Sequence, residues 1–152
     1  MVDAVQIDSR KFDCSIAATL DAIGDRWTLL ILRDLFKGVR RFEDLQKDLG
    51  IARNLLSNRL NKLISHSIVI RVPYQERPTR YEYRLTSKGL DLSPSLVALM
   101  HWGDTWCITD GPPTVLVHQE CKTPLEHSVN CPSCSETVPA KSIRSQVGPG
   151  GR

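Results

Sequence analysis

Four side chains near the carboxyl end of the chain have the types and the spacing of metal ligands. His118 and Cys121 have two residues between them, as do Cys131 and Cys134, and nine residues separate the two pairs. Imidazole nitrogen and thiolate sulfur bind Zn²⁺, which structural sites hold in a tetrahedron of four such ligands. The segment has too few apolar residues for its own core, so we expect a structural zinc ion there. The alternatives are a Cys131/Cys134 redox dithiol or a loop that binds nothing; His127 fits the ligand spacing less well.

A second group of side chains has the chemistry of DNA recognition. A helix is predicted to begin near Arg53, with Leu56, Leu60 and Leu63 on its apolar face. Its opposite face is rich in hydrogen-bond donors, and Arg and Asn can pair with guanine and adenine edges in the major groove. The residues expected to contact DNA from this helix are Arg53, Asn54, Ser57, Asn58 and Lys62. Arg59 lies at the edge of the apolar face, where it would form an internal ion pair or touch phosphate.

A predicted hairpin follows this helix, with strands over 68–73 and 81–85 and a polar turn over 75–80. Arg77 and Arg80 lie in that turn, where guanidinium groups can contact phosphates or enter the minor groove. The range 53–84 holds seven Lys or Arg residues and two Glu. Positive charge is therefore concentrated in the helix and the hairpin.

The order of the predicted elements indicates the fold. Apolar periodicity predicts helices over 14–23, 27–36 and 42–49 before the helix at Arg53, and a long helix after the hairpin that ends near Cys107, with Pro94 at a turn or bend. Gly50 lies where two helices must meet at a steep angle. We therefore expect an α+β fold, a winged helix-turn-helix with a long terminal helix, plus a small Cys/His extension at the C-terminus.

Several short segments carry a family likeness. They are Cys14-Ser15-Ile16, residues 20–35, 41–45, 50–51, 56–60 and 81–86, and Gly89. Together they resemble HxlR-type regulators of the MarR-like winged-helix group over roughly residues 12–107. Proteins similar to these are dimeric repressors or activators, so the resemblance implies a homodimer that binds double-stranded DNA.

In that family the first and last helices build the dimer interface, which the resemblance places here at 16–23 and around 96–106. Two-fold symmetry then predicts a pseudo-palindromic site with half-sites about one helical turn, roughly 34 Å, apart. Trp102 and Trp106 could pack either across this interface or inside the monomer.

Cys14 occupies the position of the family's amino-terminal cysteine, which senses oxidants or electrophiles in several similar regulators. It directly precedes a predicted helix, where a lowered thiol pKa and faster reaction are expected. The alternative is a half-buried structural cysteine, and Cys107, at an apolar helix end, is expected to be packed.

Some HxlR-type proteins carry the same four Cys/His positions in a C-terminal extension, with Gly usually following each cysteine pair. Such a glycine lets backbone N–H groups turn towards the sulfur. Lys122 and Ser135 stand at those positions here, which weakens the zinc prediction without excluding it.

Composition sets the remaining expectations. The 152 residues are 41% apolar with a net charge of +3 and five cysteines, and no signal or membrane span is evident, so we expect a cytoplasmic protein without a disulfide framework. The predicted parts are an arm (1–13), the DNA-binding and dimerisation domain (14–108), a linker (109–116), the zinc-ribbon-like extension (117–139) and a disordered tail (140–152).

We expect a sequence-specific DNA-binding transcription regulator, acting as a repressor, whose DNA affinity responds to an oxidant or a ligand that remains unknown. No catalytic constellation is evident and four ligands would close a zinc sphere, so the chain is not expected to be an enzyme. DNA binding should need no cofactor. The alternative is a protein-interaction module built on a winged helix that has lost DNA binding.

Overall fold

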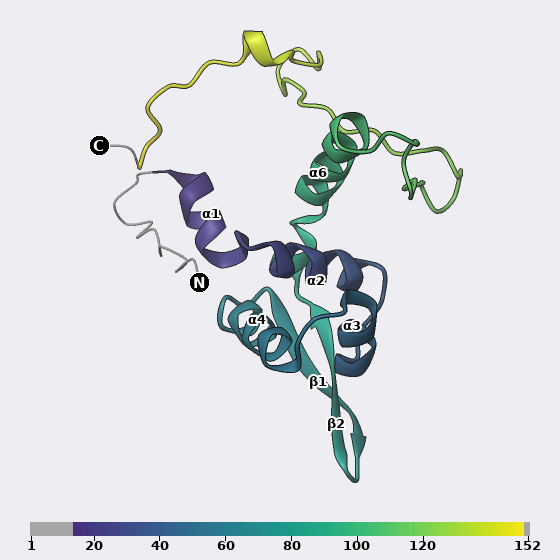
Figure 1. Ribbon diagram of the computed structural model, residues 1–152. Helices are drawn as coiled ribbons and strands as arrows, with labels where there is room; N and C mark the ends of the chain where they lie inside the picture. Colours follow the sequence, from purple (N-terminus) through teal and green to yellow (C-terminus); the bar gives the residue numbers. More distant parts are fainter. Residues whose placement is uncertain (1–13, 151–152) are drawn as a thin grey trace. The chain divides into compact units, whose positions relative to one another are not determined.

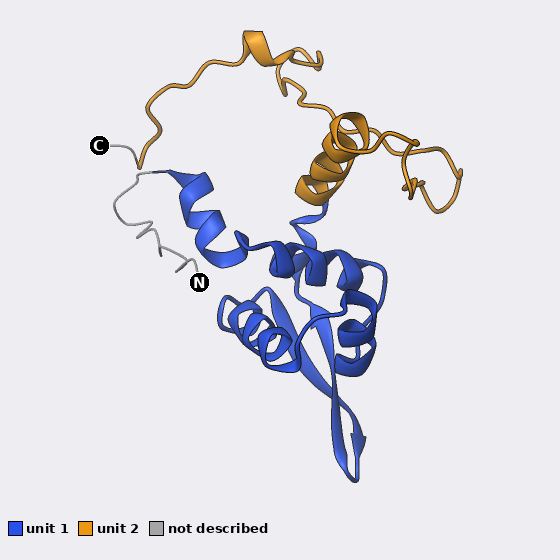
Figure 2. Ribbon diagram, in the orientation of Figure 1, with its two compact units in different colours: residues 1–93 blue, residues 94–152 orange. Residues whose placement is uncertain are grey.

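The computed structural model describes residues 14–150, so the predicted arm and the last two residues lie outside the described part (Figure 1). The chain divides into two compact units, residues 1–93 and 94–152 (Figure 2). Each unit is described by itself below. None of the helices between residues 14 and 150 combines the length and the apolar character needed to cross a membrane.

Four helices open the first unit: α1 (Ser15–Ile23), α2 (Arg26–Phe36), α3 (Phe42–Leu49) and α4 (Arg53–Ser65). Their bounds agree closely with the predicted ranges because the capping signals are present in the sequence. Asp25 caps α2 and accepts a hydrogen bond from the Thr28 N–H at 3.0 Å. Gly50 ends α3 with a φ of 59°, a conformation that glycine adopts without steric cost.

The core of this unit forms where α2 packs against α3, α4 and β2. The predicted apolar face of α4 is fully inside it, since Leu56, Leu60 and Leu63 are at most 1% exposed. Burying each of these side chains contributes about 1.5–3 kcal/mol. This packing fixes the rotation of α4 and turns its polar face towards solvent.

The wing is an antiparallel hairpin of β1 (Val69–Glu76) and β2 (Thr79–Leu85). Both strands run further than predicted, because pairing continues through the polar residues of the expected turn to Glu76 opposite Thr79. Arg80 was predicted in the turn; it lies in β2 instead, opposite Gln75. The base of the wing is tied to the helices, because the Tyr83 N–H donates to the Arg40 carbonyl at 2.8 Å.

The predicted long helix after the wing is divided into α5 (Ser87–Leu90) and α6 (Ser93–Trp106). Thr86 caps α5 and accepts from the Gly89 N–H at 3.1 Å. Pro94 lies in the first turn of α6, where a missing N–H costs nothing. The predicted bend near Pro94 is therefore present as the break between α5 and α6, just before Pro94.

The second unit holds α6 and the chain that follows it. The division falls at Ser93/Pro94, inside the range predicted as one domain, and no residue of α6 is buried in the single chain. Two isolated antiparallel bridges, Val117 with Pro124 and Asn130 with Thr137, form short hairpins around the Cys/His pairs. The predicted tail begins with a 3-10 turn, η2 (Ala140–Ser142).

Candidate nucleic-acid interface

A groove of about 1110 Å³ lies between the start of α4 and the wing. Four arginines and one glutamate line it, so its charge favours a polyanion. The lining residues are Arg41, Phe42, Glu43, Arg53, Asn54, Ser57, Arg71, Tyr74, Thr79, Arg80, Tyr81 and Tyr83.

Aromatic rings hold three of these arginines in place. The distances from guanidinium carbon to ring centroid are 4.6 Å for Arg41 over Tyr74, 4.8 Å for Arg53 over Phe42 and 4.1 Å for Arg71 over Tyr81. A guanidinium stacked on a ring keeps its donors free at its edge, and it loses less side-chain entropy on binding. The groove thus presents preordered hydrogen-bond donors.

The structure brings together four of the seven residues predicted to contact DNA. Arg53, Asn54, Ser57 and Arg80 line the groove. The other three lie outside its lining: Asn58 exposed and Lys62 half-buried on α4, and Arg77 exposed at the wing tip.

Sequence reasoning missed Arg41 and Arg71 as groove residues. Arg71 lies in the basic range 53–84, and Arg41 immediately precedes Phe42. Tyr74 stacks on Arg41 and Tyr81 stacks on Arg71. Both tyrosines lie in the wing, and its folding brings them to the arginines. The sequence signal was therefore the repeated nearness of Arg and aromatic residues in the hairpin.

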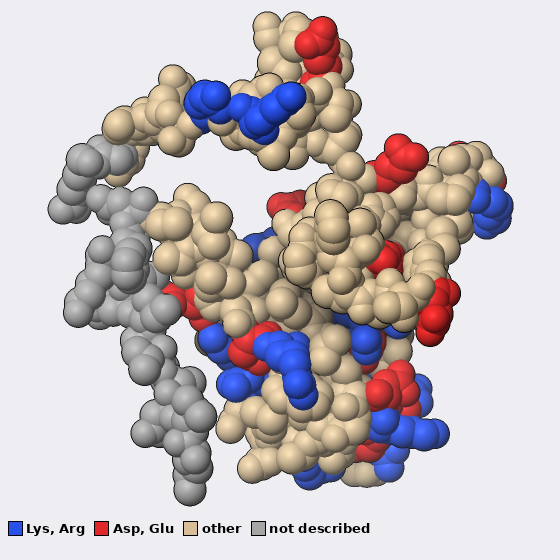
Figure 3. All heavy atoms as spheres, turned by 45° about the horizontal axis from the view of Figure 1, so that its top comes forward, with Lys and Arg blue, Asp and Glu red and all other residues tan. Residues whose placement is uncertain are grey.

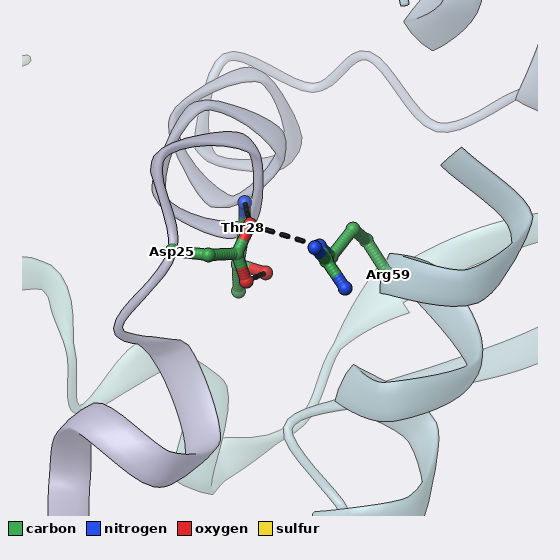
Figure 4. A network of polar contacts seen from close by, with 3 residues as sticks. All are labelled: Asp25, Thr28 and Arg59. Atoms are coloured by element: carbon green, nitrogen blue, oxygen red, sulfur yellow. Dashed lines mark hydrogen bonds and ion pairs between the residues drawn. The ribbon is translucent and has the colours of Figure 1, made fainter. Parts of the chain in front are cut away.

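Arg59 forms the internal ion pair that was one of its two predicted roles (Figure 4). Its Nε lies 2.9 Å from Asp25 Oδ1, and the same carboxylate caps α2 through Thr28. Burial raises the pKa of Asp25, but the hydrogen bonds from Thr28 and the charge of Arg59 outweigh it, and the pKa is lowered overall. Arg59 thus ties α4 to the start of α2.

Charge alone does not mark the interface. On the face drawn in Figure 3, Lys and Arg side chains are mixed with Asp and Glu, in keeping with the small net charge of +3. The local excess of arginine in the groove, set by α4 and the wing, is the distinguishing feature.

Cys14 is exposed at the N-cap of α1, where its carbonyl accepts from the Ala18 N–H at 3.1 Å. The single chain therefore does not show the half-buried packing that was the alternative role for Cys14. The expectation that Cys107 is packed is wrong, because Cys107 follows a helix that buries none of its residues and is itself exposed.

Large apolar side chains of α1 and, separately, of α6 are exposed, and both tryptophans of α6 are among them. The exposed fractions are 70% for Ile16, 55% for Leu20, 54% for Leu99, 60% for Trp102 and 74% for Trp106. Helices with several large exposed apolar side chains are typical of protein interfaces.

The Cys/His segment brings the two members of each predicted ligand pair together. His118 Nδ1 lies 3.1 Å from Cys121 Sγ, and hydrogen bonding from the Cys134 and Ser133 backbones and from the Cys134 side chain lowers the pKa of the Cys131 thiol. Hydrogen bonding with Thr123 and His118 lowers the pKa of the Cys121 thiol to about 7. Within residues 14–150, no three His, Cys, Asp or Glu side chains converge on one point, so the two pairs are formed but not joined.

Helices α3 and α4 with the Gly50 turn form a helix-turn-helix, and the β1–β2 wing completes a basic groove beside it. These features define the class of winged helix-turn-helix transcriptional regulators. The model of the HxlR-like helix-turn-helix family matches residues 22–110, and the chain belongs to this family.

Individual relatives agree with this assignment. An uncharacterized HTH-type transcriptional regulator of Mycobacterium tuberculosis is 44% identical over 149 residues, which cover 97% of this chain and 94% of that protein. The crystal structure of PA1607, a candidate transcription factor, matches with a TM-score of 0.83 at 36% identity, over 92% of this chain and 99% of that one. The redox regulator HypR in its oxidized form matches with a TM-score of 0.58 at 29% identity, over 63% of this chain and all of HypR.

Proposed function

We propose that the protein regulates transcription by binding specific duplex sites as a homodimer, with α4 in the major groove and the wing on the flanking backbone. The observation that carries this proposal is the groove that joins the start of α4 to the arginines of the wing. Occupying a promoter in this way blocks transcription, so repression is the proposed outcome. The protein acts by binding and not as an enzyme, and DNA binding needs no cofactor.

The residues divide into two tasks. Arg53, Asn54 and Ser57 lie at the start of α4, the part of a recognition helix that reaches base edges. Arg71 and Arg80 lie on the wing strands, where they meet phosphates or the minor groove. Base contacts supply specificity, and phosphate contacts supply position and most of the salt dependence.

Replacing one arginine of each group tests the proposal. Arg53→Ala combined with Arg80→Ala should weaken binding to the target duplex by about 1–3 kcal/mol per residue and leave the dimer intact. The measurement is fluorescence anisotropy at one stated salt concentration. The matched control, Arg84→Ala with Lys88→Ala, also removes two positive charges but none from the groove lining.

Equal losses in the two double variants would mean that only net charge matters. Unchanged affinity in the groove variant would remove α4 and the wing from the interface and favour the protein-interaction module instead.

We further propose that Cys14 makes DNA binding respond to oxidants. Its sulfur is exposed at the start of α1, and the similar protein HypR is named a redox regulator. With hydrogen peroxide as oxidant, the thiolate attacks one peroxide oxygen and the O–O bond breaks, so that Cys14 becomes a sulfenic acid. The other oxygen leaves as hydroxide and takes up a proton from solvent to form water. The altered side chain then shifts the equilibrium between DNA-binding and non-binding states.

Cys14→Ser should abolish the effect of peroxide on DNA affinity, while Cys107→Ser, which removes another exposed thiol, should keep it. Anisotropy titrations before and after peroxide treatment measure both. An undiminished response in Cys14→Ser would place sensing at the C-terminal cysteines.

A further inference from the structure

The Cys/His segment contains two loops with the same backbone structure. Each begins with the first ligand of a pair, His118 or Cys131, whose N–H donates to the carbonyl five residues later at 2.9 Å in both loops. The residue after each second ligand donates back to the first ligand's carbonyl, at 2.9 Å for Lys122 and 2.8 Å for Ser135. The bridges Val117–Pro124 and Asn130–Thr137 close the two loops at equivalent places.

Both loops also use the left-handed region at the same position. Lys122 has a φ of 59° and Ser135 a φ of 61°. Residues other than glycine rarely adopt this backbone conformation, because it crowds the Cβ atom. The two residues that replace the expected glycines therefore keep the glycine conformation, and the missing glycines do not count against metal binding as the sequence suggested.

This backbone conformation sets the ligand atoms side by side. His118 Nδ1 and Cys121 Sγ are 3.1 Å apart, close to the separation of about 3.5 Å that two ligands of one tetrahedral zinc require. His127 is engaged elsewhere, since its Nδ1 lies 2.9 Å from His101 Nδ1.

Nothing apolar holds the two loops in place. From residue 117 to 139 every side chain is exposed except Cys131 and Val138, which are half-buried. A segment without a core is ordered by a cross-link or by a metal. The nine residues between Cys121 and Cys131 reach up to about 30 Å when extended, so they allow the loops to meet.

We propose that the two loops close on a single Zn²⁺ ion held by His118, Cys121, Cys131 and Cys134. Three thiolates and one neutral imidazole are a donor set that favours zinc in tetrahedral geometry. Binding displaces the thiol protons to solvent and involves no change of oxidation state. All four positions are filled by protein, so the ion is structural and orders the extension. This proposal does not rest on DNA binding.

The test titrates the reduced, metal-stripped full-length protein with Co²⁺ and then Zn²⁺. One equivalent of Co²⁺ should produce the intense visible absorption of a tetrahedral thiolate site, and one equivalent of Zn²⁺ should abolish it. Trypsin cleavage at Lys122 should slow when Zn²⁺ is bound. Absorption typical of an octahedral ion, or no saturable binding, would overturn the proposal, as would a Cys131–Cys134 disulfide that forms equally fast with and without Zn²⁺.

Matched variants identify the ligands. Cys131→Ser and His118→Ala should each lower zinc affinity more than about 100-fold, beyond the loss typical of residues that only support ligands. Cys107→Ser and His127→Ala remove side chains of the same two types outside the proposed site. They should leave the zinc affinity unchanged. Lys122→Gly with Ser135→Gly keeps all four ligands and should bind equally or more tightly. Loss of binding in a control, or retained affinity in both ligand variants, would contradict the assignment.

Discussion

Arg53 and Arg59 lie on the same helix, α4, but their guanidinium groups have different partners. Arg53 stacks on Phe42 and lines the groove, whereas Arg59 forms a partly buried ion pair with Asp25. The sequence alone left both roles open for Arg59, because its position at the edge of the apolar face suits either. The pairing depends on where the start of α2 lies against α4, which is a tertiary property.

The Asp25–Arg59 pair makes stability depend on pH. The pKa of Asp25 is lowered in the folded state, so its stabilising contribution is present above the ordinary value of 3.8 and is lost as the pH falls through the lowered value. Asp25→Asn keeps a capping side chain but removes the charge. At pH 7 it should cost about 0.5–1 kcal/mol of unfolding free energy, and the difference from wild type should shrink at pH 3.

Urea denaturation at the two pH values measures this difference. If wild type and Asp25→Asn differ equally in unfolding free energy at pH 3 and pH 7, the charge of Asp25 contributes nothing and only the capping geometry matters.

At the scale of elements, α4 and the wing should differ in what they contribute to binding. Arg53→Lys keeps the charge but loses the planar fork and the stacking on Phe42, so it should reduce discrimination between target and scrambled duplexes by about 1–3 kcal/mol with an unchanged salt slope. Arg71→Ala should weaken binding to both duplexes alike and reduce the salt slope by about 1. Anisotropy titrations over a range of salt concentrations separate the two effects, and the reverse pattern would exchange the roles of helix and wing.

The elements themselves were largely predictable. Apolar spacing and the stop at Gly50 predicted α1 to α4 and the buried leucines of α4, because helix periodicity is a local signal. The full length of the wing was not predictable, since residues 75–80 are polar and pair through the backbone alone. Arg41 and Arg71 were missed for the same reason: strand pairing brings the aromatic rings to them.

At the scale of the whole molecule, the homodimer proposal depends on α1 and α6. Leu20→Glu and Trp106→Glu each replace an exposed apolar side chain with a negatively charged one. Each should therefore leave the monomer folded but disfavour the dimer, because burying an unpaired charge is costly. Sedimentation velocity should show monomers, while Val147→Glu, at another exposed apolar position, should stay dimeric. Dimers of unchanged stability in both helix variants would place the interface elsewhere.

The function proposed for this chain is to read a DNA sequence as a symmetric dimer. Selection of bound duplexes from a random pool by the wild-type protein tests it most directly, because no operator need be known beforehand. A symmetric dimer should enrich a motif of two inverted half-sites whose centres lie about one helical turn, roughly 34 Å, apart. A pool that remains random after repeated selection would contradict it.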